Sequence, residues 1–154
     1  MVSSMKRKYK SSATYGSDFE QEVFRMLESI GLPFVKETTL TNSKVRKVDL
    51  GCDLEVKVNG KSVFIELKTK QDHQCLSYDL TGNKERSLKN HQIKRLHYLV
   101  IQFRPNKHIK EVEMYVLSKQ ELIEFIATHS KNSISRKDCA EFGTKIEDMR
   151  WLND

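Results

Sequence analysis

Apolar and polar residues alternate in two short stretches on either side of Asn59-Gly60, at positions 54–58 and 62–68. Both stretches have the length of a β-strand, and the second contains a continuous apolar run. Asn-Gly is the dipeptide that most favours a two-residue hairpin turn, because both turn positions need positive φ. The pattern therefore predicts a β-hairpin whose second strand is buried.

Helical spacing of apolar side chains appears over residues 19–30. Ser17 precedes this stretch as a favourable N-cap, with Glu20 at the capping-box position, and Gly31 follows it as a favourable C-terminal stop. The pattern predicts a helix that begins near Ser17 and ends before Gly31.

Shorter signals predict the remaining elements of a mixed α/β fold. We expect a strand at 34–40, a polar loop at 69–86, a short helix at 88–96, strands at 98–103 and 113–117, and a helix from a Ser118–Glu121 capping box to about 128. Residues 129–154 are polar, with one short amphipathic piece that ends at 151–152.

The hairpin brings three charged residues to one edge of the predicted sheet. Asp53 and Glu66 are equally far from the turn, so they are expected opposite each other. Side chains alternate with period two, and Lys68 therefore shares the face of Glu66. Charged groups at the end of a buried strand are costly unless they are paired or used. The alternative is a surface hairpin with alternating charges.

Two carboxylates beside a lysine suit a divalent cation. Mg²⁺ prefers oxygen ligands and keeps several waters, so one or two carboxylates and a phosphate can complete its shell. The ion polarises a phosphoryl oxygen and lowers the pKa of a bound water, while a lysine can orient that water or stabilise negative charge. The pattern favours a metal-assisted hydrolytic site.

Four sequence blocks extend this picture over most of the chain. They are YGSDFEQEV with Glu20, the hairpin with Asp53 and Glu66-Leu67-Lys68, LKNHQIKRLHYLVIQF, and SISRKDCAEFG. In this order they resemble the PD-(D/E)xK nuclease superfamily and are most similar to the RecU-type Holliday junction resolvases. The separation of Asp53 and Glu66 is also similar to that of cellular resolvases.

The resemblance implies a restriction-endonuclease-like fold with an αβββαβ core, in which helices flank a mixed central sheet. It implies hydrolysis of DNA phosphodiester bonds with Mg²⁺ or Mn²⁺ as cofactor. The implied catalytic set is Glu20, Asp53, Glu66 and Lys68. Asp53, Glu66 and the Leu67 carbonyl would bind the metal, and Lys68 would position the attacking water. Gln71 is implied as an active-site polar group.

One departure from the RecU type concerns the substrate. Those resolvases carry a long projecting insertion between their early strands, whereas residues 41–52 here make only a short connection, and Gly51-Cys52 replaces an expected polar pair. A sequence-specific restriction or homing endonuclease of the same fold is therefore an alternative. A DNA-binding protein that cuts nothing is a second alternative, although the intact Asp53, Glu66 and Lys68 count against it.

Charge and length agree with a DNA-binding domain. The chain has 154 residues, 27 Lys and Arg against 21 Asp and Glu, and a net charge of +6, and such an excess suits a polyanion. We expect a basic flexible arm over residues 1–14 and a single nuclease domain over 15–154. The expected DNA contacts are Lys70, Lys89, Gln92, Lys94 and Arg95. Cutting two strands suggests a homodimer, and branched or duplex DNA is the expected partner.

Cysteine usage and hydropathy suggest the compartment. The three cysteines are far apart and have no metal-ligand spacing, so free thiols in a reducing environment are expected. No apolar run approaches membrane-spanning length, and the N-terminus lacks the apolar core of a signal peptide. These features predict a cytoplasmic protein without a membrane partner.

Overall fold

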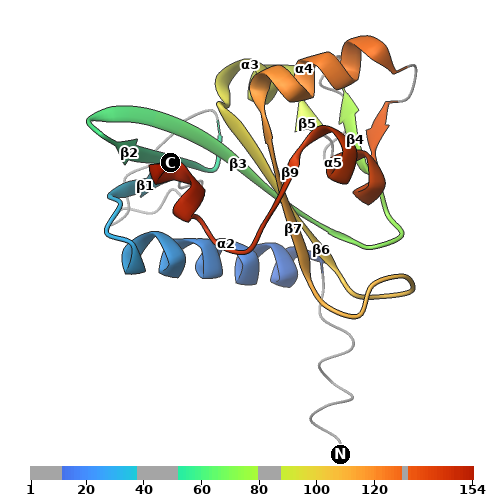
Figure 1. Ribbon diagram of the computed structural model, residues 1–154, viewed down its shortest axis with the longest axis horizontal. Coiled ribbons are helices and arrows are strands. Elements are labelled where there is room, and N and C mark those ends of the chain that lie inside the picture. The colour runs from blue at the N-terminus through green and yellow to red at the C-terminus, as the bar shows by residue number, and fades with distance from the viewer. Residues whose placement is uncertain (1–11, 38–51, 80–87, 130–131) are drawn as a thin grey trace, which may run out of the picture.

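A six-stranded mixed sheet forms the centre of the computed structural model, which describes residues 12–37, 52–79, 88–129 and 132–154 (Figure 1). The strands lie in the order β1-β2-β3-β6-β7-β9. They are β1 (Phe34–Lys36), β2 (Leu54–Val58), β3 (Lys61–Gln71), β6 (Tyr98–Arg104), β7 (Glu113–Ser118) and β9 (Thr144–Ile146).

Helices flank this sheet, as the sequence predicts, and a small second sheet accompanies it. The helices are α2 (Ser12–Ser29), α3 (Asn90–Arg95), α4 (Lys119–Thr128), α5 (Arg136–Phe142) and the 3₁₀ helix η1 (Arg150–Asn153). The second sheet has the order β5-β4-β8, from β4 (Leu76–Asp79), β5 (Leu88–Lys89) and β8 (Ser133–Ile134). Within the described ranges, no helix is long and apolar enough to span a membrane.

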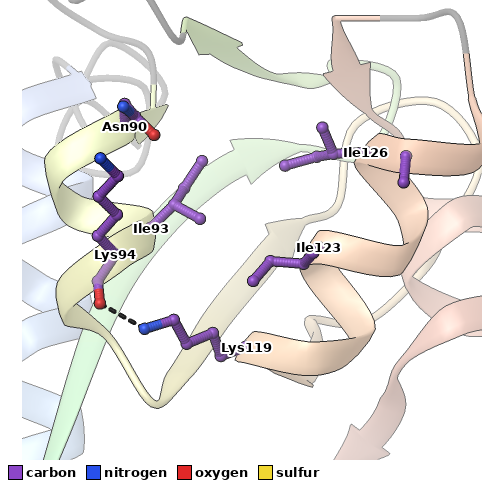
Figure 2. A pocket seen from close by; sticks show the side chains of 7 residues that line it. Asn90, Ile93, Lys94, Lys119, Ile123 and Ile126 are labelled. Carbon is purple, nitrogen blue, oxygen red and sulfur yellow. Dashed lines mark hydrogen bonds between the residues drawn. The ribbon is translucent and has the colours of Figure 1, made fainter.

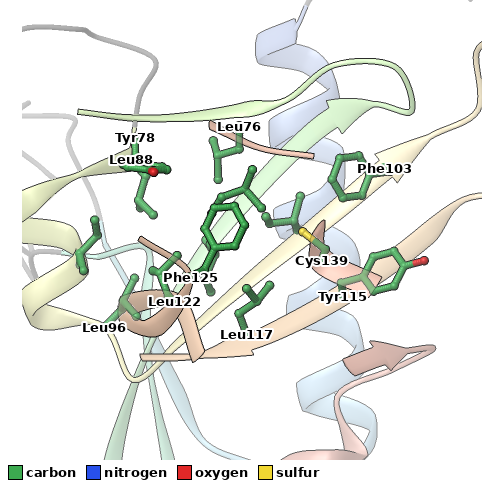
Figure 3. Packing of buried hydrophobic residues seen from close by; sticks show 14 residues of the cluster. Leu76, Tyr78, Leu88, Leu96, Phe103, Tyr115, Leu117, Leu122, Phe125 and Cys139 are labelled. Atoms are coloured by element: carbon green, nitrogen blue, oxygen red, sulfur yellow. The ribbon is translucent and has the colours of Figure 1, made fainter. Parts of the chain in front are cut away.

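Two apolar clusters pack against the sheet. One joins α2 to the sheet and includes Phe19, Val23 and Leu27 of the helix. The other, drawn in Figure 3, packs α3, α4, α5 and the small sheet against β6 and β7, with Phe125 of α4 among its fully buried members. Burial of this apolar area is the main stabilising contribution to the fold.

The predicted hairpin is confirmed in turn and in register. Asn59 and Gly60 have φ of 51° and 78°, as a two-residue turn of this kind requires. Leu54 pairs with Ile65, so continuing the same register by one residue sets position 53 opposite position 66.

The strand that carries Glu66 is interior to the sheet. β3 pairs with β2 on one side, antiparallel, and with β6 on the other, parallel. Ile65, Glu66 and Leu67 are all buried. The elements α2, β1, β2, β3, α3 and β6 follow in the predicted α-β-β-β-α-β order, with β4 and β5 inserted before α3.

The first helix begins earlier than its sequence pattern predicts. α2 starts at Ser12, so Ser17 is inside the helix, its predicted capping role is wrong, and residues 12–14 do not belong to a flexible arm. The end is as expected: Gly31 has φ of 75°, and its N–H donates to the Glu28 carbonyl while that of Leu32 donates to Leu27. These two bonds satisfy carbonyls at the helix end. The rest of the arm, residues 1–11, lies outside the described residues.

Other predicted elements agree with the structure in the centre of the chain and differ at their ends. The strands near 98–103 and 113–117 and the helix behind the Ser118–Glu121 capping box are confirmed. The first strand is described only as Phe34–Lys36, because residues 38–51 lie outside the described part. The helix predicted at 88–96 spans only Asn90–Arg95, since Leu88 and Lys89 form β5.

In two segments the structure contains strands and a helix that the sequence pattern does not predict. The polar stretch at 69–86 is not one loop, because β3 continues to Gln71 and Leu76–Asp79 forms β4; residues 80–87 are outside the described ranges. The C-terminal stretch contains β8, α5 and β9. A capping box in which Ser135 and Asp138 bond each other's backbone N–H marks the start of α5 and could have been found by its spacing.

Asp72, just beyond β3, fastens the loop between β6 and β7. Its carboxylate accepts hydrogen bonds from four successive backbone N–H groups, those of Asn106, Lys107, His108 and Ile109, at 2.7–3.1 Å. Burial by itself raises the pKa of the Asp72 carboxyl, but these four donors outweigh it and the pKa lies well below its usual range.

We expect Asp72→Asn to lower the melting temperature at pH 7 clearly more than Asp148→Asn does. Asp148 is a half-exposed aspartate that pairs with Arg150. A group with a depressed pKa stabilises the fold above its unfolded pKa of about 3.9. The difference between wild type and Asp72→Asn should therefore be constant from pH 8 to 5 and shrink as the pH falls below about 4. Thermal unfolding at several pH values measures it, and equal melting temperatures for the two variants would contradict the role of the carboxylate.

Candidate functional site

Three carboxylates lie in one row across β1, β2 and β3. The Glu37 N–H donates to the Asp53 carbonyl at 2.8 Å, and the hairpin register sets Asp53 opposite Glu66. Directly paired residues of antiparallel strands share a face of the sheet, so the three positions belong to one face. On β6 the partner of Glu66 is Leu99, which belongs to the cluster opposite α2.

Glu66 is the most unusual group of this row. The residue is only 2% exposed, and its buried Oε2 atom has no hydrogen-bond partner among the described residues. Burial, and next the negative charge of Asp53, raise the pKa of Glu66 to about 10, against a smaller opposite effect of Lys68. A carboxyl group in this setting calls for a proton or a cation.

Asp53 is held in place by the backbone of β3. The pairing of β2 with β3 ends at Leu54 and Ile65, while β3 continues alone on that edge of the described sheet. The Leu67 N–H, which a longer β2 would pair, donates instead to Asp53 Oδ2 at 2.7 Å. The Asp53 carboxylate is therefore fixed directly beside the Glu66-Leu67-Lys68 segment.

Glu20 and Lys68 complete the set that the sequence predicts. Burial and the charge of Asp53 raise the pKa of Glu20, while the positive charges of Lys36 and Lys68 lower it. Glu20 on α2 therefore lies within electrostatic reach of Asp53 and Lys68, although α2 covers the other face of the sheet. The four groups come together at the edge where β2 leaves β3.

Two residues next to these four have no role in the site predicted from the sequence. Glu37 was missed, and its charge also raises the pKa of Glu66; its position opposite Asp53 could have been found only from the register of β1. Cys52 is buried, its thiol donates to the Leu54 carbonyl at 3.5 Å, and burial raises its pKa to about 12. A thiol that stays protonated does not bind metal.

The residues present fit a hard divalent cation held by two carboxylates. Among the described residues, no group of three or more His, Cys, Asp or Glu side chains is arranged to hold a metal ion. Mg²⁺ does not need one, because it keeps several waters and usually takes one or two carboxylates. Asp53 and Glu66 supply these, and the unpartnered Oε2 of Glu66 is an oxygen that a cation would satisfy. The Leu67 carbonyl is the third predicted ligand.

Gln71 is placed apart from this set. It lies five residues after Glu66 along β3, about 16 Å at the usual rise per residue and on the opposite face. Its side-chain oxygen accepts a hydrogen bond from Asn106 Nδ2 at 2.6 Å, and its N–H donates to Gln74. Lys70, in contrast, lies two residues after Lys68 and shares its face.

The predicted DNA contacts on α3 point in different directions. Arg95 lies 3.7 Å from the ring centre of Phe64, which precedes Glu66 by two residues on the same face. Lys94 instead lines a groove of about 310 Å³ between α3 and α4, where its carbonyl accepts a hydrogen bond from Lys119 Nζ (Figure 2). Gln92 accepts a hydrogen bond from the Lys89 N–H and so caps the helix.

Comparison with solved structures shows a distant structural likeness, whereas comparison by sequence finds none. No protein-family model matches the sequence, and no curated protein is similar to it. The 1.6 Å structure of Archaeoglobus fulgidus Hjc, a Holliday junction resolvase from an archaeal hyperthermophile, is similar with a TM-score of 0.48 and 14% sequence identity, over 84% of this chain and 95% of that chain. So distant a likeness assigns no activity, and function has to be argued from the residues of the site.

Proposed function

We propose that this protein is a Mg²⁺- or Mn²⁺-dependent DNA endonuclease. The observation that carries the proposal is the buried, unpartnered Oε2 of Glu66 beside Asp53, two residues before Lys68 on one face of β3. A structural role alone does not explain why a buried glutamate of an interior strand lies opposite a second acidic residue, immediately before the neighbouring strand, whose negative charge raises its pKa.

Each residue of the set has a role in phosphodiester hydrolysis. A divalent ion bound there would polarise the phosphoryl oxygen and lower the pKa of a bound water. Asp53 and Glu66 would hold the ion, and the Leu67 N–H fixes the orientation of Asp53. Lys68 orients the attacking water and stabilises the negative charge that develops on the phosphate. Glu20 supports the position of Lys68 through its charge.

Branched DNA is the proposed substrate class, and a homodimer the proposed assembly. The sequence blocks over residues 88–103 and 133–143 resemble RecU-type resolvases, and a two-fold dimer places two sites against opposing strands of a four-way junction. A restriction or homing activity on linear duplex is the second candidate, favoured by the short connection at residues 41–52.

Cleavage of matched four-way junction, flap, linear duplex and single-stranded substrates with Mg²⁺ tests the substrate class. We expect the junction to be cut fastest, by roughly tenfold over the duplex of equal length, a difference of about 1.4 kcal/mol in transition-state binding. Sedimentation of the protein alone and with junction DNA checks the dimer. A particular linear sequence that competes with the junction and is itself cut would instead establish the second candidate.

Binding to DNA should depend strongly on salt, because Lys and Arg displace counterions from phosphates. Arg95→Gln should weaken binding on unrelated sequences and reduce the salt slope by about one, since Arg95 lies on the face of Glu66. Lys94→Gln is the matched control, because its side chain lines the groove towards α4, and Lys89→Gln is measured beside it. Titrations at four salt concentrations give the slopes. If Lys94→Gln has the larger effect, DNA crosses the α3–α4 groove instead.

A further inference from the structure

A pocket with several cationic side chains lies at the far end of β3, away from the carboxylates. It has a volume of about 240 Å³ and lies between the turn after β3, the β6–β7 loop and the start of α5. Its lining residues are Asp72, His73, His108, Ser135, Arg136 and Lys137.

The carboxylate of Asp72, the acidic residue of the pocket, already has hydrogen-bond partners. The Asp72 carboxylate accepts four backbone N–H groups from residues 106–109, and His73 Nδ1 lies 3.5 Å from its other oxygen. Asp72 therefore does not need the cations of the pocket as partners, and it holds His108 at the rim through the backbone.

The cations of the pocket retain donors for a ligand. Arg136 Nη1 lies 3.4 Å from Glu113, but its buried Nε has no hydrogen-bond partner within the described ranges. Lys137 is exposed and has no ion-pair partner within 4.0 Å in the described part of the chain. Two histidines add donors when they are protonated. Such a set suits a tetrahedral oxyanion, above all a phosphate group.

The position of the pocket connects it with the proposed site. Asp72 follows Glu66 by six residues, so the two lie about 20 Å apart along β3, and the strand alternation puts Glu66, Lys68 and Lys70 on the side of Asp72. Successive base pairs of a DNA duplex advance about 3.4 Å along the helix axis, and the phosphates that face the protein at a given distance can belong to either strand. A distance of about 20 Å therefore corresponds to roughly six base pairs of a duplex that follows β3.

We propose that this pocket binds a backbone phosphate of the DNA substrate, roughly six base pairs from the scissile phosphate. The proposal rests on the proposed function, since it takes the carboxylate site as the place of cleavage. It adds a second, non-catalytic contact that fixes the direction of the duplex relative to β3. It also sets a minimum length for the DNA arm on that side of the cut.

The test compares Lys137→Gln with Arg150→Gln. Arg150 is an exposed cation on η1, whose neighbour Trp151 packs against Tyr98 at the other end of β6. DNA binding is measured in Ca²⁺, to prevent cutting, on two substrates whose arm extends either four or twelve base pairs beyond the cleavage point. We expect Lys137→Gln to bind the long arm roughly fivefold more weakly than wild type, with a salt slope lower by about one, and the short arm equally well. Arg150→Gln should match wild type on both.

Inorganic phosphate provides the second measurement, by NMR of the His108 ring in wild type and Lys137→Gln. If Lys137→Gln binds each of the two arm lengths as tightly as wild type does, the proposal is overturned. If phosphate shifts His108 in wild type while arm length has no effect, the pocket holds a free phosphate group and the DNA contact is refuted. If wild type binds no DNA, the proposed function is wrong. If phosphate also leaves the NMR signal of His108 unchanged, the pocket is not an anion site.

Discussion

Glu66→Gln should reduce the rate of DNA cleavage with Mg²⁺ by a factor of about 10³, Asp53→Asn should do the same, and Lys68→Ala should reduce it by about 10²–10³. The two carboxylates act by holding the metal, and the lysine acts on charge that develops in the transition state, where removal of one such group costs about a hundredfold to a thousandfold. Binding to DNA in Ca²⁺ should change less than threefold, because none of the three groups is proposed as a main phosphate contact.

The control is Glu55→Gln, a carboxylate on the same hairpin that pairs with Lys57 and lies outside the proposed site. It should cut at the wild-type rate. Titration with Mn²⁺ should show a bound ion in wild type and in Glu55→Gln but not in Asp53→Asn, which separates a nuclease from a DNA-binding protein of the same fold.

Thermal unfolding distinguishes a functional from a structural role for Glu66. Without metal at neutral pH, the melting temperature of Glu66→Gln should equal or exceed that of wild type, because a pKa of about 10 leaves Glu66 protonated and the amide keeps its shape and neutral charge. Full Mg²⁺-dependent cleavage by Glu66→Gln would reject the site, and a large loss of stability would show that Glu66 is structural.

The same substitution at two glycines should change stability in opposite directions. A Cβ at Gly143, the residue that ends α5, would lie 2.6 Å from the Val116 carbonyl oxygen and 2.9 Å from Leu117 Cγ. Backbone cannot yield as a side chain can, so Gly143→Ala should destabilise the fold by about 3 kcal/mol. Gly16 is inside α2, and no atom of the described residues lies within 4 Å of its Cβ position, so Gly16→Ala should stabilise the fold by about 0.5–1 kcal/mol.

Urea unfolding of wild type and both variants measures the two free energies of unfolding. A stable Gly143→Ala would mean that α5 packs less closely against β7 than the Val116 contact indicates. A destabilised Gly16→Ala would mean that the helix does not extend as far as Ser12.

Local chemistry explains why part of this molecule is predictable from its sequence. The turn at Asn59-Gly60 depends on two residues that tolerate positive φ, and the capping box at Ser118 and Glu121 is complete within four residues. Because the turn sets the hairpin register, the opposition of Asp53 and Glu66 followed directly, without any knowledge of the rest of the fold.

Elements whose stability comes from distant contacts were not predictable in this way. β4 and β8 pair across more than fifty residues through Leu76 and Ile134. α2 extends beyond its apparent cap at Ser17 because Tyr15, in its added turn, stacks on Arg104 of β6, with 3.7 Å between the guanidinium carbon and the ring centre. Neither contact leaves a periodic signal in its own segment, since packing decides them and not local propensity.

The sequence by itself determined the hairpin, the interior position of its second strand and the grouping of Asp53, Glu66 and Lys68, because these depend on one turn and on the alternation of a strand. Only the tertiary structure decided that Glu20 reaches this group from α2, that Glu37 joins the row, and that Gln71 lies apart with Asn106. It also decided that the Asp72 carboxylate is occupied by the β6–β7 loop. These arrangements depend on the pairing and packing of segments far apart in the chain, which no local pattern specifies.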